Sequence, residues 1–125
     1  MIKGIHHISM KCETTVELEK AKSFYLNLLG FSLVREWPAG IMIDSGNGLI
    51  EIFCNGAGVR ETGAIRHVAF ATDNVDCMVK KIRAAGYEVF KEPNDIEIPS
   101  EPVFRARMAF CFGPLGEQIE FFQEK

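Results

Sequence analysis

The sequence predicts an α+β fold made of two modules with the same plan, each a strand, a helix and then three strands. Two repeated motifs predict this arrangement. The segment Ile5–Met10 (IHHISM) returns as Ile65–Phe70 (IRHVAF), and Leu49–Phe53 (LIEIF) returns as Gln118–Phe122 (QIEFF). A stretch with helical apolar spacing follows the first motif of each half. We therefore expect one βαβββ module in each half of the chain.

The length of the chain limits how these modules can be organised. At 125 residues the chain suits a single domain that buries most of its apolar surface. The first module should span about residues 1–58 and the second about residues 63–125. The glycine-rich segment Asn55–Gly63 is the expected linker between them.

In the first module, alternation of apolar and polar residues predicts a strand over Ile2–Cys12. A helix should begin near Thr14, because the Thr-x-x-Glu spacing is that of a capping box, and should end at Gly30. Turns rich in glycine and proline separate the later elements. The three strands expected there are Phe31–Trp37, Gly40–Asp44 and Leu49–Cys54.

The second module repeats this order with a shorter helix, capped by Asp73 or Asn74 and stopped at Gly86. Glu92–Pro102 contains three prolines and predicts a loop. Two interpretations of this loop are about equally good: it covers a pocket, or it is a connection with a structural role only. The three strands expected in this module are Tyr87–Lys91, Ala106–Phe112 and Gln118–Phe122.

Composition excludes several classes of protein. The net charge is -3 and no basic block occurs, which argues against a nucleic-acid partner. No apolar run is long enough to span a membrane, and the N-terminus lacks a signal-peptide core, so we expect a cytoplasmic protein. The four cysteines form no Cys-x-x-Cys pair, which argues against a zinc finger or a redox motif.

The repeated motifs place one glutamate and one histidine in each module. Glu51 and Glu120 lie between apolar residues, so strand alternation turns each carboxylate away from the face that should pack against a helix. His7 lies on the face opposite Ile8, whereas its neighbour His6 does not, which favours His7. His67 shares its face with two alanines that are small enough to leave a hollow.

A single glutamate or histidine on a strand is usually an ordinary surface residue. Two carboxylates together in one cavity would repel each other, however, and a divalent cation would remove this repulsion. Nitrogen and oxygen ligands without sulfur suit zinc, nickel, cobalt, manganese or ferrous iron. The motifs therefore predict a metal site.

Arg105 and Arg107 are weaker candidates for binding substrate. We place them with Ala109 and Cys111 on the cavity face of their strand, opposite a row of phenylalanine and methionine residues. There they would bind an anionic group of the substrate through forked hydrogen bonds. In the alternative, one or both pair with the acidic residues of Glu92–Glu101.

The two motifs, together with the stretch Phe24-Tyr25 to Leu29-Gly30-Phe31, resemble the vicinal oxygen chelate superfamily, which includes glyoxalase I and bleomycin-resistance proteins. The resemblance covers the whole chain. It implies that the two modules form a curved mixed sheet around one metal-containing cavity. The implied metal ligands are His7, Glu51, His67 and Glu120. It also implies a small-molecule substrate and a homodimer.

The ligand order His, Glu, His, Glu resembles that of bacterial glyoxalase I. It implies a metal-dependent lyase or isomerase in which Glu120 or Glu51 removes a proton from the carbon next to a carbonyl group. The metal implied is nickel, cobalt or zinc in the first place, with manganese or iron as further possibilities. Three alternatives remain: an epimerase like methylmalonyl-CoA epimerase, an iron-dependent dioxygenase, and a non-catalytic drug- or metabolite-binding module. Glu51 stands where the epimerases have glutamine. The turn at Gly113–Gly116 lacks the aspartate usual in glyoxalase I, and no glutathione-binding set is recognisable, so the substrate stays open.

Overall fold

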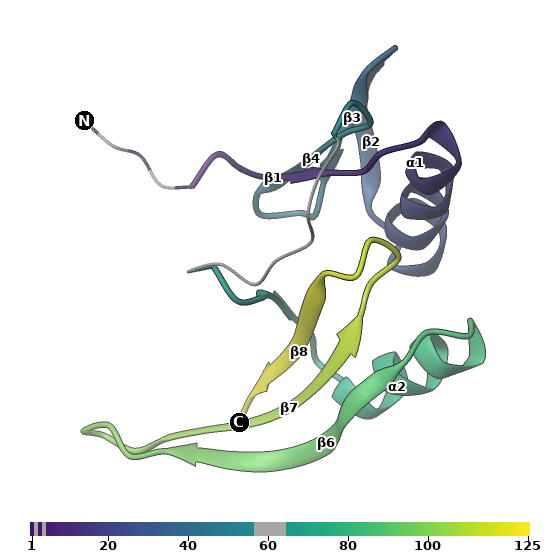
Figure 1. Ribbon diagram of the computed structural model, residues 1–125. Coiled ribbons are helices and arrows are strands. Elements are labelled where there is room, and N and C mark those ends of the chain that lie inside the picture. The colour runs from purple at the N-terminus through teal and green to yellow at the C-terminus, as the bar shows by residue number, and fades with distance from the viewer. Residues whose placement is uncertain (2, 4, 57–64) are drawn as a thin grey trace. The chain divides into compact units, whose positions relative to one another are not determined.

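Each half of the chain folds into a four-stranded mixed sheet with helical structure after its first strand (Figure 1). The computed structural model describes residues 1, 3, 5–56 and 65–125. Within it the chain divides into two units, Met1–Arg60 and Glu61–Lys125. The α+β class and the repeated βαβββ plan are confirmed. Most of the expected linker, Asn55–Gly63, lies outside the described residues.

The sheets of the two units have the same topology. In the first unit the order is β1-β4-β3-β2, and in the second it is β5-β8-β7-β6. The first strand of each sheet runs parallel to the last, and the remaining neighbours are antiparallel. The strands are β1 (His7–Lys11), β2 (Ser32–Trp37), β3 (Gly40–Asp44), β4 (Leu49–Phe53), β5 (Val68–Ala71), β6 (Val89–Ile98), β7 (Phe104–Phe112) and β8 (Gln118–Glu124).

The helical segments begin at side-chain caps. Thr14 Oγ1 accepts a hydrogen bond from the Glu17 backbone N–H at 3.1 Å before α1 (Thr15–Lys22), and Asn74, rather than Asp73, caps α2 (Val75–Ala84). The first helix continues as a π-helical segment, η1 (Ser23–Leu28), a change that its sequence does not signal. None of the helices in the described part of the chain is long and apolar enough to cross a membrane.

One face of each sheet forms the core of its unit. In β3 and β4 the isoleucines Ile41, Ile43, Ile50 and Ile52 are at most 2% exposed, and Phe24 and Tyr25 of η1 are buried as well. In the second unit α2 contacts β6, β7 and β8. There Ile119 and Phe121 of β8 are buried. The residues that flank Glu51 and Glu120 therefore lie in the two cores, as strand alternation predicts.

The loop expected over Glu92–Pro102 is wrong as far as Ile98, because β6 continues to that residue and pairs with β7; residues 99–103 form the connection between the two strands. The pairing shifts register between Lys91 and Asn94, at the place where Pro93 lies. Since β6 is the edge strand of its sheet, a proline without a donor N–H costs little there. Composition alone cannot distinguish an irregular edge strand from a loop.

Replacement of Thr14 by alanine should lower the free energy of unfolding by about 1 kcal/mol, because the first turn of α1 would lose its side-chain acceptor. Chemical denaturation monitored by circular dichroism measures the change. Thr15→Ala is the matched control, since Thr15 lies inside the helix and alanine has the higher helix propensity. Equal losses in both variants would contradict the capping role.

Candidate functional site

The first unit brings His7 and Glu51 together on the face of the sheet away from the core. His7 is the first residue of β1, and Glu51 is at the centre of β4, its parallel neighbour. His7 Nε2 lies 3.6 Å from Glu51 Oε1. The Ser9 hydroxyl donates a hydrogen bond to the same carboxylate oxygen at 3.1 Å. His6 is outside this pair, with its Nδ1 3.0 Å from His7 Nδ1.

The second unit repeats the arrangement with His67 and Glu120. His67 directly precedes β5, Glu120 lies in β8, and His67 Nε2 is 3.0 Å from Glu120 Oε2. Glu120 is the one buried charged residue of the described chain, with 10% of its side chain exposed. The His67 ring meets the Phe110 ring edge-on, with 5.1 Å between the ring centroids.

The matching strand registers explain why each unit produces such a pair. Glu51 is level with Ser9 on the neighbouring parallel strand, and Glu120 is level with Ala69 in the same way. The histidine lies two residues before that level, on the same face of the sheet. Ser9 is a contributor that we did not predict. The sequence does indicate it, because Ser9 is two residues after His7 on the same strand and so points to the same face.

The donor atoms of both pairs fit a divalent cation. A carboxylate has about four lone-pair sites, yet in the described structure Glu120 is bonded to His67 alone. A nearly buried carboxylate with one imidazole partner is costly to desolvate, and a cation would offset that cost. No group of three or more histidine, cysteine, aspartate or glutamate side chains suited to a metal occurs among the described residues, so the four-ligand set stays a prediction.

A hollow of about 610 Å³ lies in the second unit on the same face as Glu120. Ala69 and Ala71 form part of its wall together with Phe122, which confirms that these small side chains leave space. Asp73 and Glu124 contribute carboxylates to the lining. The lining of the hollow therefore combines apolar side chains with two acidic residues.

Aromatic side chains cover the adjoining part of this face. Phe110 is level with Glu120 in the antiparallel register, so the two side chains point to the same side. Phe90 packs against both Phe110 and Phe112, with centroid distances of 5.5 Å and 4.4 Å. We did not predict this aromatic surface, because a row of apolar residues along β7 reads equally well as core.

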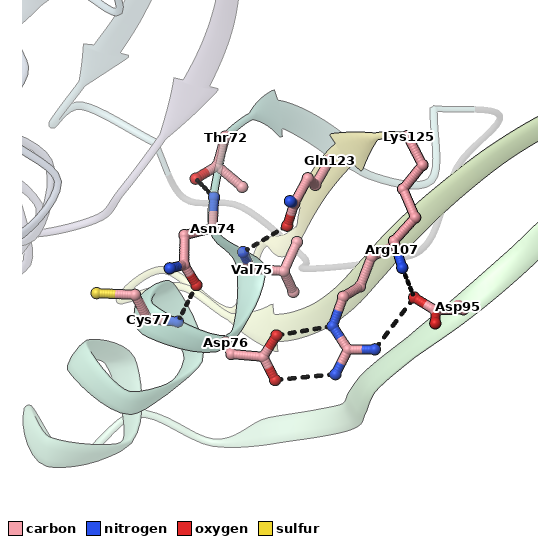
Figure 2. Close-up of polar contacts among 9 residues, drawn as sticks. All are labelled: Thr72, Asn74, Val75, Asp76, Cys77, Asp95, Arg107, Gln123 and Lys125. Carbon is pink, nitrogen blue, oxygen red and sulfur yellow. Dashed lines mark hydrogen bonds and ion pairs between the residues drawn. The ribbon is translucent and has the colours of Figure 1, made fainter.

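The face assigned to Arg105 and Arg107 is wrong. Their row on β7 includes Ala109 and Cys111, both buried, which pair with the core residues of β8 rather than with Glu120. Arg107 instead donates two hydrogen bonds to the Asp76 carboxylate of α2, at 2.7 Å and 2.9 Å (Figure 2). Both faces of β7 carry apolar residues, so its alternation does not reveal which face the helix covers.

The acidic partners considered as the alternative are present. Arg105 donates to Glu97 at 2.9 Å, and Arg107 donates to Asp95 at 3.2 Å. Lys125 also contacts Asp95 at 2.8 Å, which extends the network shown in Figure 2. The guanidinium groups therefore join α2, β6 and β7. Their predicted role in substrate binding gains no support from this arrangement.

These ion pairs shift the ionisation of their carboxyl groups. The hydrogen bonds from Arg107 lower the pKa of Asp76, and those from Lys125 and then Arg107 lower the pKa of Asp95. In the core, burial raises the pKa of the Cys111 thiol to about 12. Cys111 is therefore a protonated, unreactive thiol at neutral pH.

Two like units, each with a histidine–glutamate pair on the open face of its sheet, define a repeated-module protein with a candidate metal-binding face. Residues 4–121 match the model of the Glyoxalase/Bleomycin resistance protein/Dioxygenase superfamily. The chain belongs to this superfamily.

Several known proteins are similar to this chain. It is 29% identical over 136 aligned positions to a Bacillus subtilis strain 168 protein described as "Uncharacterized protein YwkD", with 99% of both chains covered. The fosfomycin resistance protein FosX from Listeria monocytogenes aligns with a TM-score of 0.77 at 20% identity, covering 100% of this chain and 96% of its own. Lactoylglutathione lyase from Agrobacterium tumefaciens aligns with a TM-score of 0.68 at 16% identity, covering 98% and 95%. At these identities the two structures show the shared fold.

Arg107→Gln should destabilise the protein at pH 7, and the difference from wild type should shrink at pH 3. The pKa values of Asp76 and Asp95 are lowered below 3.8 in the folded chain, so the ion pairs with Arg107 stabilise the fold above that pH. This stabilisation is lost as the two carboxyl groups gain protons at lower pH. Urea unfolding midpoints at the two pH values measure this.

Arg35→Gln on β2 is the matched control for Arg107→Gln, because the described structure gives this exposed arginine no ion pair. Its difference from wild type should be small and independent of pH. If the difference in unfolding midpoint between Arg107→Gln and wild type stays constant from pH 7 to pH 3, the proposed contribution of the ion pairs is contradicted.

Proposed function

We propose that the protein is a metal-dependent lyase or isomerase of the glyoxalase I type, acting on a small molecule with a carbonyl group. The observation that supports this proposal is the matched pair of contacts, His7–Glu51 and His67–Glu120, one in each unit. A non-catalytic binding module would need neither the two histidines nor the two carboxylates. We further propose that the whole chain acts as one domain, in a cytoplasmic homodimer.

One divalent ion would be held by the four side chains His7, Glu51, His67 and Glu120, supplied by modules at about residues 1–58 and 63–125. Two imidazole nitrogens and two carboxylates favour nickel, cobalt or zinc, with manganese or iron as alternatives. The ion, when bound, supplies a Lewis acid that stabilises negative charge on the substrate oxygen. The two carboxylates would balance its charge.

A glutamate then acts as the general base. It removes the proton from the carbon that bears the hydroxyl group of a hemithioacetal and returns it to the neighbouring carbonyl carbon, while the hydroxyl proton passes to the former carbonyl oxygen. The atoms balance, because the substrate and the resulting 2-hydroxy thioester are isomers. Geometry favours Glu120 over Glu51, since the Glu51 carboxylate already accepts a hydrogen bond from the Ser9 hydroxyl, whereas among the described residues Glu120 contacts His67 alone.

The neighbouring aromatic surface would help this proton transfer. Phe110 lies on the same face as Glu120 and in ring contact with His67. Apolar rings beside a carboxylate keep out water, which strengthens the electrostatic interactions at the reacting atoms. The phenylalanine would also hold the His67 ring edge-on, in a fixed orientation.

Purified protein should bind close to one divalent metal ion per chain, and His7→Gln should weaken this binding at least tenfold, because one of four ligands is lost. Isothermal titration of metal-free protein with nickel or zinc measures the affinity. Arg35→Gln, at an exposed position of β2, is the control and should bind as wild type does. Equal loss in both variants, or no metal affinity in the wild type, would overturn the proposed metal site.

Glu120→Gln should lower kcat on the hemithioacetal of methylglyoxal by a factor of about 10² to 10⁴, the usual contribution of a general base. Formation of the thioester is followed by its ultraviolet absorbance. Glu51→Gln tests the other glutamate and should cost less if Glu120 is the base. Glu97→Gln, on the exposed edge strand β6, is the control. Activity of Glu120→Gln equal to that of Glu97→Gln would exclude Glu120 as the base.

A further inference from the structure

We propose that Lys91 binds an anionic group of the substrate, a carboxylate or a phosphate, at a distance from the reacting carbonyl. The inference rests on the proposed function, because it takes the His67–Glu120 pair as the reacting end of the site. It adds the chemical class of the substrate: an anion with a flat, apolar body.

Lys91 lies in one row with the candidate ligands. Lys91 of β6 is level with Phe110 of β7, and Phe110 is level with Glu120 of β8. Lys91 Nζ is 6.0 Å from the centroid of the Phe110 ring, the same ring that contacts His67. Two strand spacings separate β6 from β8, so the lysine and glutamate backbones are about 10 Å apart.

The ammonium group of Lys91 is available to a ligand. Within the described residues it contacts a phenylalanine ring and no carboxylate. The neighbouring arginines differ from it: Arg83 of α2 is paired with Glu92 of β6, and on β7 Arg105 is paired with Glu97 and Arg107 with Asp76 and Asp95. An exposed cation without a counter-charge, on the same face as Glu120, is suited to an incoming anion.

The surface between Lys91 and Glu120 is aromatic. Phe90 and Phe110 lie at 33° to each other, and Phe90 lies at 32° to Phe112. Phe90 is 40% exposed, so part of this surface is open. Flat apolar or aromatic groups pack well on such rings. The body of the substrate would therefore cover Phe110 while its two ends reach Lys91 and Glu120.

The charges on this face orient the substrate. The hollow beside Ala69 and Phe122 is lined by the carboxylates Asp73 and Glu124, which would repel an anion. In the strand order β5-β8-β7-β6, the hollow lies at the β5 side of Glu120. Lys91 lies at the β6 side, with Phe110 of β7 between it and Glu120. An anionic group is therefore directed toward β6 and away from the hollow.

Calorimetric titration of the nickel-loaded protein with para-substituted benzohydroxamates tests the inference. A hydroxamate offers two adjacent oxygens to a metal and does not react, and its para substituent extends across one ring. The 4-carboxy compound should bind about fivefold tighter than the uncharged 4-carbamoyl compound, the size expected for one exposed charge pair. A 4-phosphono compound shows which anion is preferred.

Lys91→Gln should abolish the preference for the charged compound and leave the affinity for 4-carbamoylbenzohydroxamate unchanged, whereas Lys91→Arg should retain the preference. Lys81→Gln, on α2, is the matched control and should behave as wild type does. Equal binding of both compounds to the wild type, or a preference that survives Lys91→Gln, would overturn the role of Lys91 alone. Failure of both compounds to bind the nickel-loaded protein would overturn the proposed function as well.

Discussion

The placement of a carboxylate on an inner strand of each sheet is the constraint on which the candidate site depends. Glu120 lies between the core residues Ile119 and Phe121, and only a tenth of its side chain is exposed. An ionised group in such a position needs an opposite charge or hydrogen-bond donors close by. In the described structure His67 is the one partner it has. The sheet thus holds the Glu120 carboxylate in a position where it is poorly solvated, and a divalent cation would compensate its negative charge.

The two glutamates lie at the same register position in their sheets, but different residues lie next to them on the parallel strand. Beside Glu51 the strand carries Ser9, whose hydroxyl donates to the carboxylate, and at the same level beside Glu120 it carries Ala69. The first carboxylate is therefore better satisfied, and the second is both more buried and next to a hollow. This asymmetry within a symmetric repeat is the physical basis for assigning unequal roles to the two glutamates.

The open face of the second sheet carries residues whose placement strand alternation alone does not predict. Arg105 and Arg107 are two residues apart, a spacing that suits an anion, but they lie on the other face, where they bind carboxylates of α2 and β6. The aromatic row that includes Phe110 resembles core and instead borders the candidate ligands. On a strand that is apolar on both faces, alternation defines two rows without saying which row the helix covers.

The sequence by itself determined the repeated βαβββ plan, the Thr14 cap of α1, and the face shared by His7 with Glu51 and by His67 with Glu120. These follow from local rules, namely strand alternation, capping chemistry and the repeat, which act over a few residues. Only the tertiary structure decided that β6 extends through Pro93, that the arginines face α2, and that Lys91 shares a row with Glu120. Those features depend on which strands become neighbours and on the register between them. Contacts between residues far apart in the chain set both, and no local pattern encodes them.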